Sequence, residues 1–181
     1  DDLLHRMQAR HPECPERTRA IMERLEANGL AGDLMRLPPS APASDADLTR
    51  VHPAEHIALL DKLTPTNASL TPIDADTSLS ATSMIAARAA AGTAVDALDG
   101  VMAGRFEKAF CAIRPPGHHA ETRLAMGFCF FNSIAIAARR ALDVHGLARV
   151  AIVDFDVHHG NGSAEIFASD PRVMVCSSFQ H

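Results

Sequence analysis

The residues best suited to chemistry lie in one short stretch, residues 154–162, which reads Asp-Phe-Asp-Val-His-His-Gly-Asn-Gly. It follows residues 149–153, an apolar and β-branched run that predicts a buried parallel strand. Side chains alternate along an extended chain, so Asp154, Asp156 and His158 are expected to point the same way. Carboxylate and imidazole groups together are a ligand set typical of zinc. The stretch therefore predicts a metal or catalytic site where a strand ends.

A second pair of histidines, His118 and His119, lies upstream behind another apolar run. Residues 108–113 predict a second buried strand, and the Arg-Pro-Pro-Gly sequence after it would end that strand in a rigid turn. A solvated polar turn is the alternative interpretation for either pair. Two strand ends that each offer two histidines favour a shared site. The three phenylalanines of residues 126–132 could form a wall of that site or ordinary packing.

The elements that must position these residues alternate between strand and helix patterns. Helical patterns cover about residues 15–28, 45–51, 53–63, 80–103, 133–144 and 163–168, and residues 172–177 predict a third strand. The order strand, helix, strand over residues 108–155 predicts a right-handed parallel βαβ unit. The fold class is therefore α/β, and ligands of such folds bind at the carboxyl edge of the sheet.

Other polar residues have simpler explanations. Asp76 precedes the longest helical pattern, where a helix N-terminal cap explains it as well as a function does. His5 and His11 are expected to lie on the surface or in a turn. His52 and His56 are expected to form a surface pair, because no carboxylate partner is evident for them.

The overall composition limits the class of protein. With 181 residues, 47% of them apolar and 22% charged, the chain is long enough for one globular domain with a sizeable core. A net charge of −5 without a basic cluster disfavours direct binding of nucleic acid. No apolar run approaches the roughly 20 residues that span a membrane. The first 30 residues are polar and show no signal peptide, so a cytoplasmic location is expected.

None of the four cysteines lies in a Cys-x-x-Cys pair. Cys111 and Cys176 fall inside apolar, strand-like runs, so both are expected to be buried free thiols of a reducing compartment. A disulfide framework is therefore not expected.

Three motifs, in this order along the chain, resemble the histone deacetylase superfamily. They are Arg-Pro-Pro-Gly-His-His-Ala-Glu at residues 114–121, Met-Gly-Phe-Cys-Phe-Phe-Asn at residues 126–132 and the nine residues 154–162, and the likeness extends to His-Pro-Glu at 11–13 and Asp-Thr at 76–77. The motifs resemble those of class II deacetylases and bacterial histone-deacetylase-like amidohydrolases, with acetylpolyamine amidohydrolases as relatives. The resemblance implies the arginase/deacetylase type of α/β fold, a parallel sheet flanked by helices.

The resemblance implies different roles for the paired histidines. His118 and His119 match the family's catalytic pair. Asp154 matches the carboxylate behind His118, and Asn161 matches the partner of His119. An aspartate behind one ring and an asparagine behind the other are expected to separate the two pKa values. His119 would then be the neutral general base and later the acid for the amine leaving group, while His118 stabilises charge. His159 has no assigned role.

The resemblance also implies a zinc ion and a tunnel for the substrate. Asp156 and His158 match two of the three zinc ligands. Gly127 and Phe128 resemble the wall of the acyl-lysine tunnel, and Asp76 resembles the rim carboxylate that binds the substrate backbone. Zinc would polarise the acetamide carbonyl and lower the pKa of a bound water.

A structural potassium site is a further implication of the resemblance. The backbone oxygens of Asp154, Asp156 and His158, together with Ser177 and Ser178, resemble its ligands. The expected cofactors are therefore Zn²⁺ and, at this second site, K⁺.

The chain departs from the family pattern in what it lacks. In family members the third zinc ligand (an aspartate), the catalytic tyrosine and a glycine-rich tunnel segment all follow the second histidine motif, and this chain contains no tyrosine. The family's first strand also precedes the His-Pro-Glu segment. We therefore expect residues 1–181 to form a single deacetylase-type domain that is incomplete at its C-terminus and at its N-terminus, and inactive on its own.

Three functions compete on these grounds. The first is zinc-dependent hydrolysis of an acetamide in acetyl-lysine peptides or proteins, or in acetylpolyamines. The second is a non-catalytic relative that binds an acyl-lysine or an amine. The third, an arginase-like hydrolase with two manganese ions, is disfavoured because Asn161 stands where a further carboxylate is needed. The expected partner is the acylated amine substrate, with no nucleic acid and no membrane, and the oligomeric state is not predicted.

Overall fold

The computed structural model describes residues 5–180, and its strand β3, Val150–Asp154, ends at the first carboxylate of the long motif. Strand β3 pairs in parallel with β4, Val173–Ser177, and places Asp154 opposite Ser177. Helix α6, Asn161–Phe167, lies between the two strands in the sequence, as a parallel pair requires, and packs against β4. The parallel strand predicted from residue 149 and the strand predicted at residues 172–177 are therefore confirmed. The prediction that the first of them is buried is wrong, because Ala151 and Val153 are exposed.

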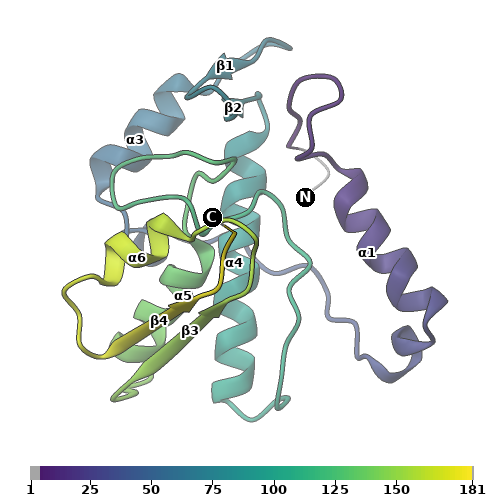
Figure 1. Cartoon of the computed structure of the whole chain (residues 1–181), viewed down its shortest axis with the longest axis vertical. Helices are drawn as coiled ribbons and strands as arrows, with labels where there is room; N and C mark the ends of the chain where they lie inside the picture. Colours follow the sequence, from purple (N-terminus) through teal and green to yellow (C-terminus); the bar gives the residue numbers. More distant parts are fainter. Residues whose placement is uncertain (1–4, 181) are drawn as a thin grey trace.

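Two helices form the layers behind this strand pair (Figure 1). Helix α5, Ser133–Asp143, packs against β3, and the long helix α4, Ser83–Met102, packs against α5. The buried side of α4 consists largely of alanines, namely Ala86, Ala87, Ala90 and Ala91. Such small side chains allow neighbouring backbones to approach closely at normal packing density.

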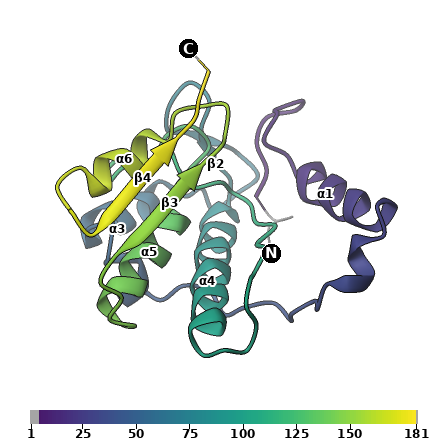
Figure 2. The same cartoon turned by 60° about the horizontal axis from the view of Figure 1, so that its bottom comes forward.

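The preceding part of the chain contains shorter elements. These are α1 (Glu16–Ala27), the 3₁₀ helix η2 (Leu30–Asp33), α2 (Asp45–Leu48), α3 (Ala54–Leu63) and the antiparallel strands β1 (Thr71–Pro72) and β2 (Ser78–Leu79). Ser44 caps α2 through a reciprocal pair of hydrogen bonds with Asp47. In Figure 1 and Figure 2, α1 lies beyond α4 as seen from the strand pair. None of the helices among residues 5–180 is both long enough and apolar enough to cross a membrane.

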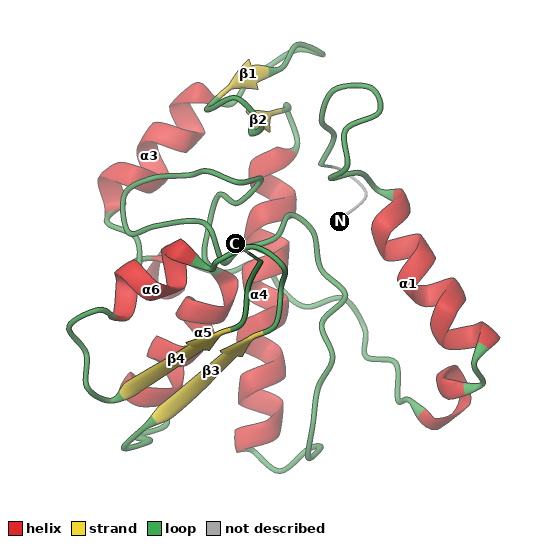
Figure 3. Cartoon of the chain, in the orientation of Figure 1, coloured by secondary structure: helices red, strands yellow, loops and turns green. Residues whose placement is uncertain are grey.

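Residues 108–113 form a loop, so the prediction of a strand there is wrong (Figure 3). A strand needs a neighbour for its backbone N–H and C=O groups, and no segment of the described chain pairs with these residues. Phe110 in this loop is 68% exposed, which an inner strand would not allow. The βαβ unit predicted over residues 108–155 is therefore not formed. The α/β class holds, with β3 and β4 as the parallel pair.

The outer face of β3 and β4 carries exposed apolar side chains. Val153 is 68% exposed and Met174 is 58% exposed. Cys176 points to the same uncovered face, so the prediction that it is buried is wrong. Cys111 lies in the loop at residues 108–113 and is only half-buried. Strand periodicity predicted the alternation of these side chains but not which face other elements cover.

Candidate active site

Two histidine rings lie side by side next to the carboxyl end of β3. The ring centroids of His118 and His119 are 4.0 Å apart. His118 Nδ1 donates to Asp154 Oδ2 at 2.8 Å. His119 Nδ1 donates to Asn161 Oδ1 at 2.7 Å. The structure thus brings together the four residues to which the resemblance assigned paired roles.

The side-chain amide of Asn161 has one defined orientation. Its Nδ2 donates to Glu121 Oε1 at 3.0 Å and lies 3.4 Å from Met126 Sδ. Because a carboxylate can only accept, this nitrogen must face Glu121, which leaves Oδ1 to accept from His119. The proton of a neutral His119 ring is therefore on Nδ1, and Nε2 carries the free lone pair.

The environment of His119 favours the neutral ring. Burial lowers the pKa of His119, and the neighbouring His118 and His158 lower it further, while the hydrogen bond to Asn161 opposes part of this change. A ring that is neutral near physiological pH, with a free Nε2, has the form required of a general base.

Asp156 and His158 form a second group beside the histidine pair. His158 Nδ1 lies 3.0 Å from Asp156 Oδ1, and the backbone N–H of His158 donates to the same oxygen at 2.7 Å. The His158 ring centroid is 5.9 Å from that of His119. Strand β3 ends at Asp154 and the chain bends at residues 156–158. That bend, rather than a continued extended strand, brings these side chains together.

Asp156 and His158 suit two positions of a zinc site. Ligand atoms at about 2.0–2.2 Å from a tetrahedral zinc lie about 3.4 Å from each other, close to the 3.0 Å between His158 Nδ1 and Asp156 Oδ1. Burial raises the pKa of Asp156, but hydrogen bonds from His158 and the charge of His118 outweigh burial and lower it overall. Within residues 5–180, no three His, Cys, Asp or Glu side chains converge closely enough to hold a metal. The described chain therefore offers two converging ligands.

Two glycines make room for the close contacts of the histidine pair. A Cβ on Gly160 would lie 2.3 Å from Asp154 Oδ2 and 3.2 Å from His118 Nδ1, so it would push into the hydrogen bond between them. Gly127 has a φ of +56°, and a Cβ there would lie 2.5 Å from Cδ2 of His119. Neither position can carry a side chain without displacing the site.

The predicted tunnel wall, Gly127 and Phe128, is held by two residues to which sequence analysis gave no role of their own. The backbone N–H of Phe128 donates to Thr77 Oγ1 at 2.9 Å, and that of Gly127 donates to Asp74 Oδ2 at 3.3 Å. Thr77 is fully buried. In the sequence, Thr77 belongs to the Asp-Thr pair that resembles the family, and Asp74 stands two residues before Asp76.

Asp76 lies on the same loop as Asp74 and Thr77. Helix α4 begins after Thr82, so the interpretation of Asp76 as a helix cap is wrong. Its backbone N–H donates to Asp74 Oδ1 at 2.8 Å, which holds the loop in a turn. The residue is exposed. Its carboxylate is therefore open to solvent near Gly127 and Phe128.

His52 and His56 are buried, so the prediction of a surface pair is wrong. Their rings stack with centroids 5.0 Å apart. His52 Nε2 accepts from the backbone N–H of Asn132 at 2.9 Å, and His56 Nε2 donates to the carbonyl of Phe130 at 3.1 Å. Burial and the charge of His56 lower the pKa of His52 to about 4. Their partners are backbone groups far along the chain, which local spacing cannot reveal.

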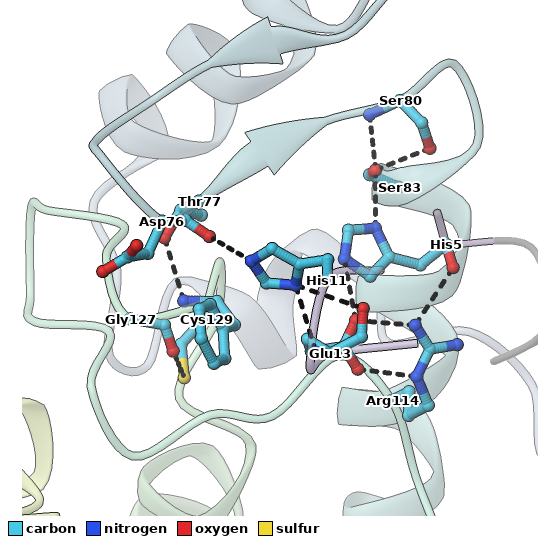
Figure 4. Close-up of polar contacts among 11 residues, drawn as sticks. His5, His11, Glu13, Asp76, Thr77, Ser80, Ser83, Arg114, Gly127 and Cys129 are labelled. Atoms are coloured by element: carbon cyan, nitrogen blue, oxygen red, sulfur yellow. Dashed lines mark hydrogen bonds and ion pairs between the residues drawn. The ribbon is translucent and has the colours of Figure 1, made fainter. Parts of the chain in front are cut away.

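His5 is fully buried, so the prediction of a surface or turn position is wrong for it (Figure 4). Its Nδ1 lies 2.8 Å from Ser83 Oγ and its Nε2 lies 3.3 Å from Oε2 of the buried Glu13. His11 is half-buried and contacts the carbonyl of Asp76 at 3.1 Å. The N-terminal arm, residues 5–13, is thus connected to α4 and to the loop of Asp76.

Ser177 and Ser178 lie beside Asp154 because of the register of β3 and β4. The N–H of Ser178 donates to the carbonyl of Asp154 at 3.0 Å. Ser177 Oγ is buried and has no hydrogen-bond partner within the described residues. An unsatisfied buried hydroxyl is uncommon and calls for an explanation such as a bound ion. His159, by contrast, is exposed and its ring lies 4.6 Å from that of Phe179.

This chain is similar to known proteins of one family. The histone deacetylase domain family matches residues 11–181. A histone deacetylase-like amidohydrolase of Pseudomonas aeruginosa is 41% identical over 172 residues, which cover 95% of this chain and 44% of that protein. The polyamine deacetylase HDAC10 of Mus musculus is 38% identical over 169 residues, which cover 91% of this chain and 25% of that protein.

Among solved structures, the HD domain of HDA15 superposes with a TM-score of 0.88 at 37% identity, over 98% of this chain and 49% of that one. This match supports the predicted arginase/deacetylase type of α/β fold, of which the chain forms a part. The chain spans less than half the length of these three relatives. The family match at residues 11–181 nevertheless includes every motif described above, and the chain belongs to the histone deacetylase family.

Proposed function

We propose that this chain supplies the proton-transfer group and two metal ligands of a zinc-dependent deacetylase. The observation that carries the proposal is the pair of adjacent histidines with unlike partners, a carboxylate behind His118 and a neutral amide behind His119. Only one ring therefore lies against a full negative charge. That asymmetry suits one ring to proton transfer and the other to stabilising charge.

His119 is the residue suited to proton transfer. Its Nδ1–H is engaged by Asn161, so Nε2 can take a proton from the attacking water. The same nitrogen can then deliver that proton to the amine as the C–N bond breaks, which leaves acetate and a free amine. His118, hydrogen-bonded to Asp154, is placed to stabilise the negative charge that develops on the former carbonyl oxygen.

Asp156 and His158 are proposed to hold the zinc ion as two of its ligands. Zinc bound there would polarise the amide carbonyl and lower the pKa of the attacking water. Catalytic zinc sites have three protein ligands, whereas residues 5–180 present no converging group of three. We therefore expect the 181-residue chain alone to bind zinc weakly and to be inactive.

The substrate that we propose is an acylated amine, either acetyl-lysine in a peptide or an acetylpolyamine. The names of the bacterial and mouse relatives support these two classes respectively. The exposed carboxylate of Asp76 could accept hydrogen bonds from a peptide backbone or from a polyamine ammonium group. Turnover of an acetyl-lysine peptide and of an acetylated polyamine by the natural gene product would distinguish them. Binding of both without turnover would instead support a non-catalytic relative.

Metal content tests the proposed zinc site. In the natural gene product, Asp156→Ala and His158→Ala are each expected to weaken zinc binding at least about 100-fold, because loss of a ligand exceeds the effect of losing an outer-shell partner. Bound zinc is measured by mass spectrometry after dialysis against a chelator. His159→Ala is the matched control, because the ring of His159 is exposed and contacts Phe179 rather than the proposed zinc ligands. Unchanged zinc content in both ligand variants would exclude the proposed site.

The acid limb of the pH–activity profile tests the role of His119. Burial holds the pKa of His119 below its ordinary value of 6.5, so activity should be lost only as the pH falls below that value. Asn161→Asp places a negative charge against Nδ1, stabilises the charged ring, and is expected to move this limb upward by about one pH unit. The limb is measured as kcat/KM between pH 5 and 8. An unmoved limb would assign the titration to another group.

We further propose that potassium binds beside β3. The buried, unpartnered Ser177 Oγ and the nearby carbonyl of Asp154 support this proposal, because K⁺ is bound by such oxygens. Replacing sodium chloride by potassium chloride at equal concentration is expected to raise the Tm of the natural gene product by about 2–4 °C. Ser177→Ala should abolish most of this difference. An equal response of wild type and variant would argue against Ser177 as a ligand.

A further inference from the structure

A buried ion pair joins the N-terminal arm to the turn ahead of His118 (Figure 4). Arg114 Nε donates to Glu13 Oε1 and Arg114 Nη2 donates to Glu13 Oε2, both at 2.6 Å. The side chain of Arg114 is 2% exposed and that of Glu13 is fully buried. Arg114 Nη2 also donates to the carbonyl of His5 at 3.1 Å. A bidentate arginine–carboxylate pair restricts the orientation of both side chains, so it fixes the N-terminal arm in position.

The arm in turn holds His11 in one orientation. His11 Nε2 lies 3.1 Å from the carbonyl of Asp76, which can only accept, so Nε2 carries a proton and donates it. His11 Nδ1 contacts the backbone of Glu13 twice, because the N–H of Glu13 donates to it at 3.0 Å and the carbonyl of Glu13 lies 3.3 Å away. Figure 4 shows His11 between Glu13 and the turn of Asp76 and Thr77. The ring thus connects the backbone of Glu13 to that of Asp76.

The same ring also contacts Phe128. The centroids of the His11 and Phe128 rings are 4.8 Å apart with an interplanar angle of 80°, a favourable edge-to-face contact. Phe128 has a φ of +70°, which a bulky residue adopts only where its surroundings hold it. Its backbone N–H is held by Thr77 at 2.9 Å. His11 and Thr77 thus restrain Phe128 from its ring and from its backbone.

We propose that His11 is a positioning residue for the substrate end of the site. One ring fixes the wall residue Phe128 and the rim residue Asp76 relative to each other. This inference rests on the proposed function, in which Phe128 borders the path of the acyl chain and Asp76 binds the substrate. The hydrogen-bond partners of His118 and His119 are Asp154 and Asn161, neither of which belongs to the N-terminal arm. Loss of His11 should therefore raise KM and leave kcat nearly unchanged.

Two amide substitutions separate the contributions of the two ring nitrogens. In His11→Asn the side-chain oxygen takes the place of Nδ1 and keeps the contact with Glu13, but the side chain is too short for Asp76 and Phe128. In His11→Gln the longer amide places a donor near the position of Nε2 and can still reach the carbonyl of Asp76. We expect KM for an acetyl-lysine peptide to rise about tenfold in His11→Asn and about twofold or less in His11→Gln.

Hydrogen exchange gives a result that does not depend on turnover. In the natural gene product, the amide of Phe128 is expected to exchange about tenfold faster in His11→Asn than in wild type. The increase should be smaller in His11→Gln, which keeps the contact with Asp76 but loses the ring contact with Phe128. If this pattern holds in a protein without deacetylase activity, the proposed function fails and the positioning role stands. Wild-type exchange and wild-type KM in His11→Asn would overturn the role of His11. An equal fall of Tm in both variants without the difference in KM or exchange would also overturn it.

Discussion

The His119→Ala variant of the natural gene product is expected to lose about 100- to 10,000-fold in kcat for hydrolysis of an acetyl-lysine peptide. The neutral ring of His119, with its proton held on Nδ1 by Asn161, is the group placed to move the proton in both halves of the reaction. Alanine removes this base and leaves Asp156 and His158 in place. Steady-state kinetics on protein with a verified zinc content measure the effect.

The neighbouring histidine of the second motif provides the control for this loss. His159→Ala removes a ring of the same size that is exposed against Phe179, and it is expected to keep kcat within about twofold of wild type. A His119→Ala variant with full zinc content and wild-type kcat would show that another group transfers the proton. The ring of His119 would then have a structural role only.

The largest effect on stability is expected from breaking the buried ion pair between Glu13 and Arg114. Arg114→Ala leaves the carboxylate of Glu13 buried without its main partner, which costs about 3–5 kcal/mol in free energy of unfolding. Chemical denaturation followed by circular dichroism measures this loss. It also reports whether unfolding remains a single transition.

An exposed ion pair of the same type is the matched control. The side chains of Arg36 and Glu26 are 59% and 58% exposed and lie 2.8 Å apart, so Arg36→Ala should change the free energy of unfolding by at most about 1 kcal/mol. A double variant with Glu13→Leu and Arg114→Met removes both buried charges and should recover part of the loss. Equal effects of Arg114→Ala and Arg36→Ala would show that the buried pair contributes no more than a surface pair.

The pH dependence of stability provides an independent test of Glu13. Burial raises the pKa of Glu13, but hydrogen bonds from His5 and Arg114 and the charge of Arg114 outweigh burial and hold it below its ordinary value of 4.5. A carboxyl group with a lowered pKa in the folded state stabilises the protein above its unfolded pKa, and this contribution is lost as the pH falls through the folded pKa. The stability difference between wild type and Glu13→Gln should therefore shrink below pH 4.5.

Local patterns in the sequence predicted most of the helices and two of the strands. The helical patterns at about residues 15–28 and 45–51 predicted α1 and α2. Residues 149–155 and 172–177 predicted β3 and β4. These signals depend on residues within a few positions of each other, so they are readable without the fold. The ends of the helices differ by a few residues, as expected from propensity alone.

The strand predicted at residues 108–113 shows where local patterns fail. Its composition suits a strand, but a strand forms only where another backbone pairs with it, and no described segment does so. The burial of His52 and His56 was missed for a related reason. Their partners, the backbone groups of Asn132 and Phe130, lie 80 and 74 residues away in the sequence.

The sequence by itself determined which chemical groups are available: two histidine pairs, two carboxylates after a strand, and motifs that resemble the histone deacetylase family. Only the tertiary structure decided which of them meet. Asp154 contacts His118 although 36 positions separate them, and Asn161 contacts His119 although 42 positions separate them. The N-terminal arm is held by the ion pair of Glu13 and Arg114, which are 101 positions apart. Residue type and periodicity are properties of the local chain, whereas these contacts depend on how distant segments pack together.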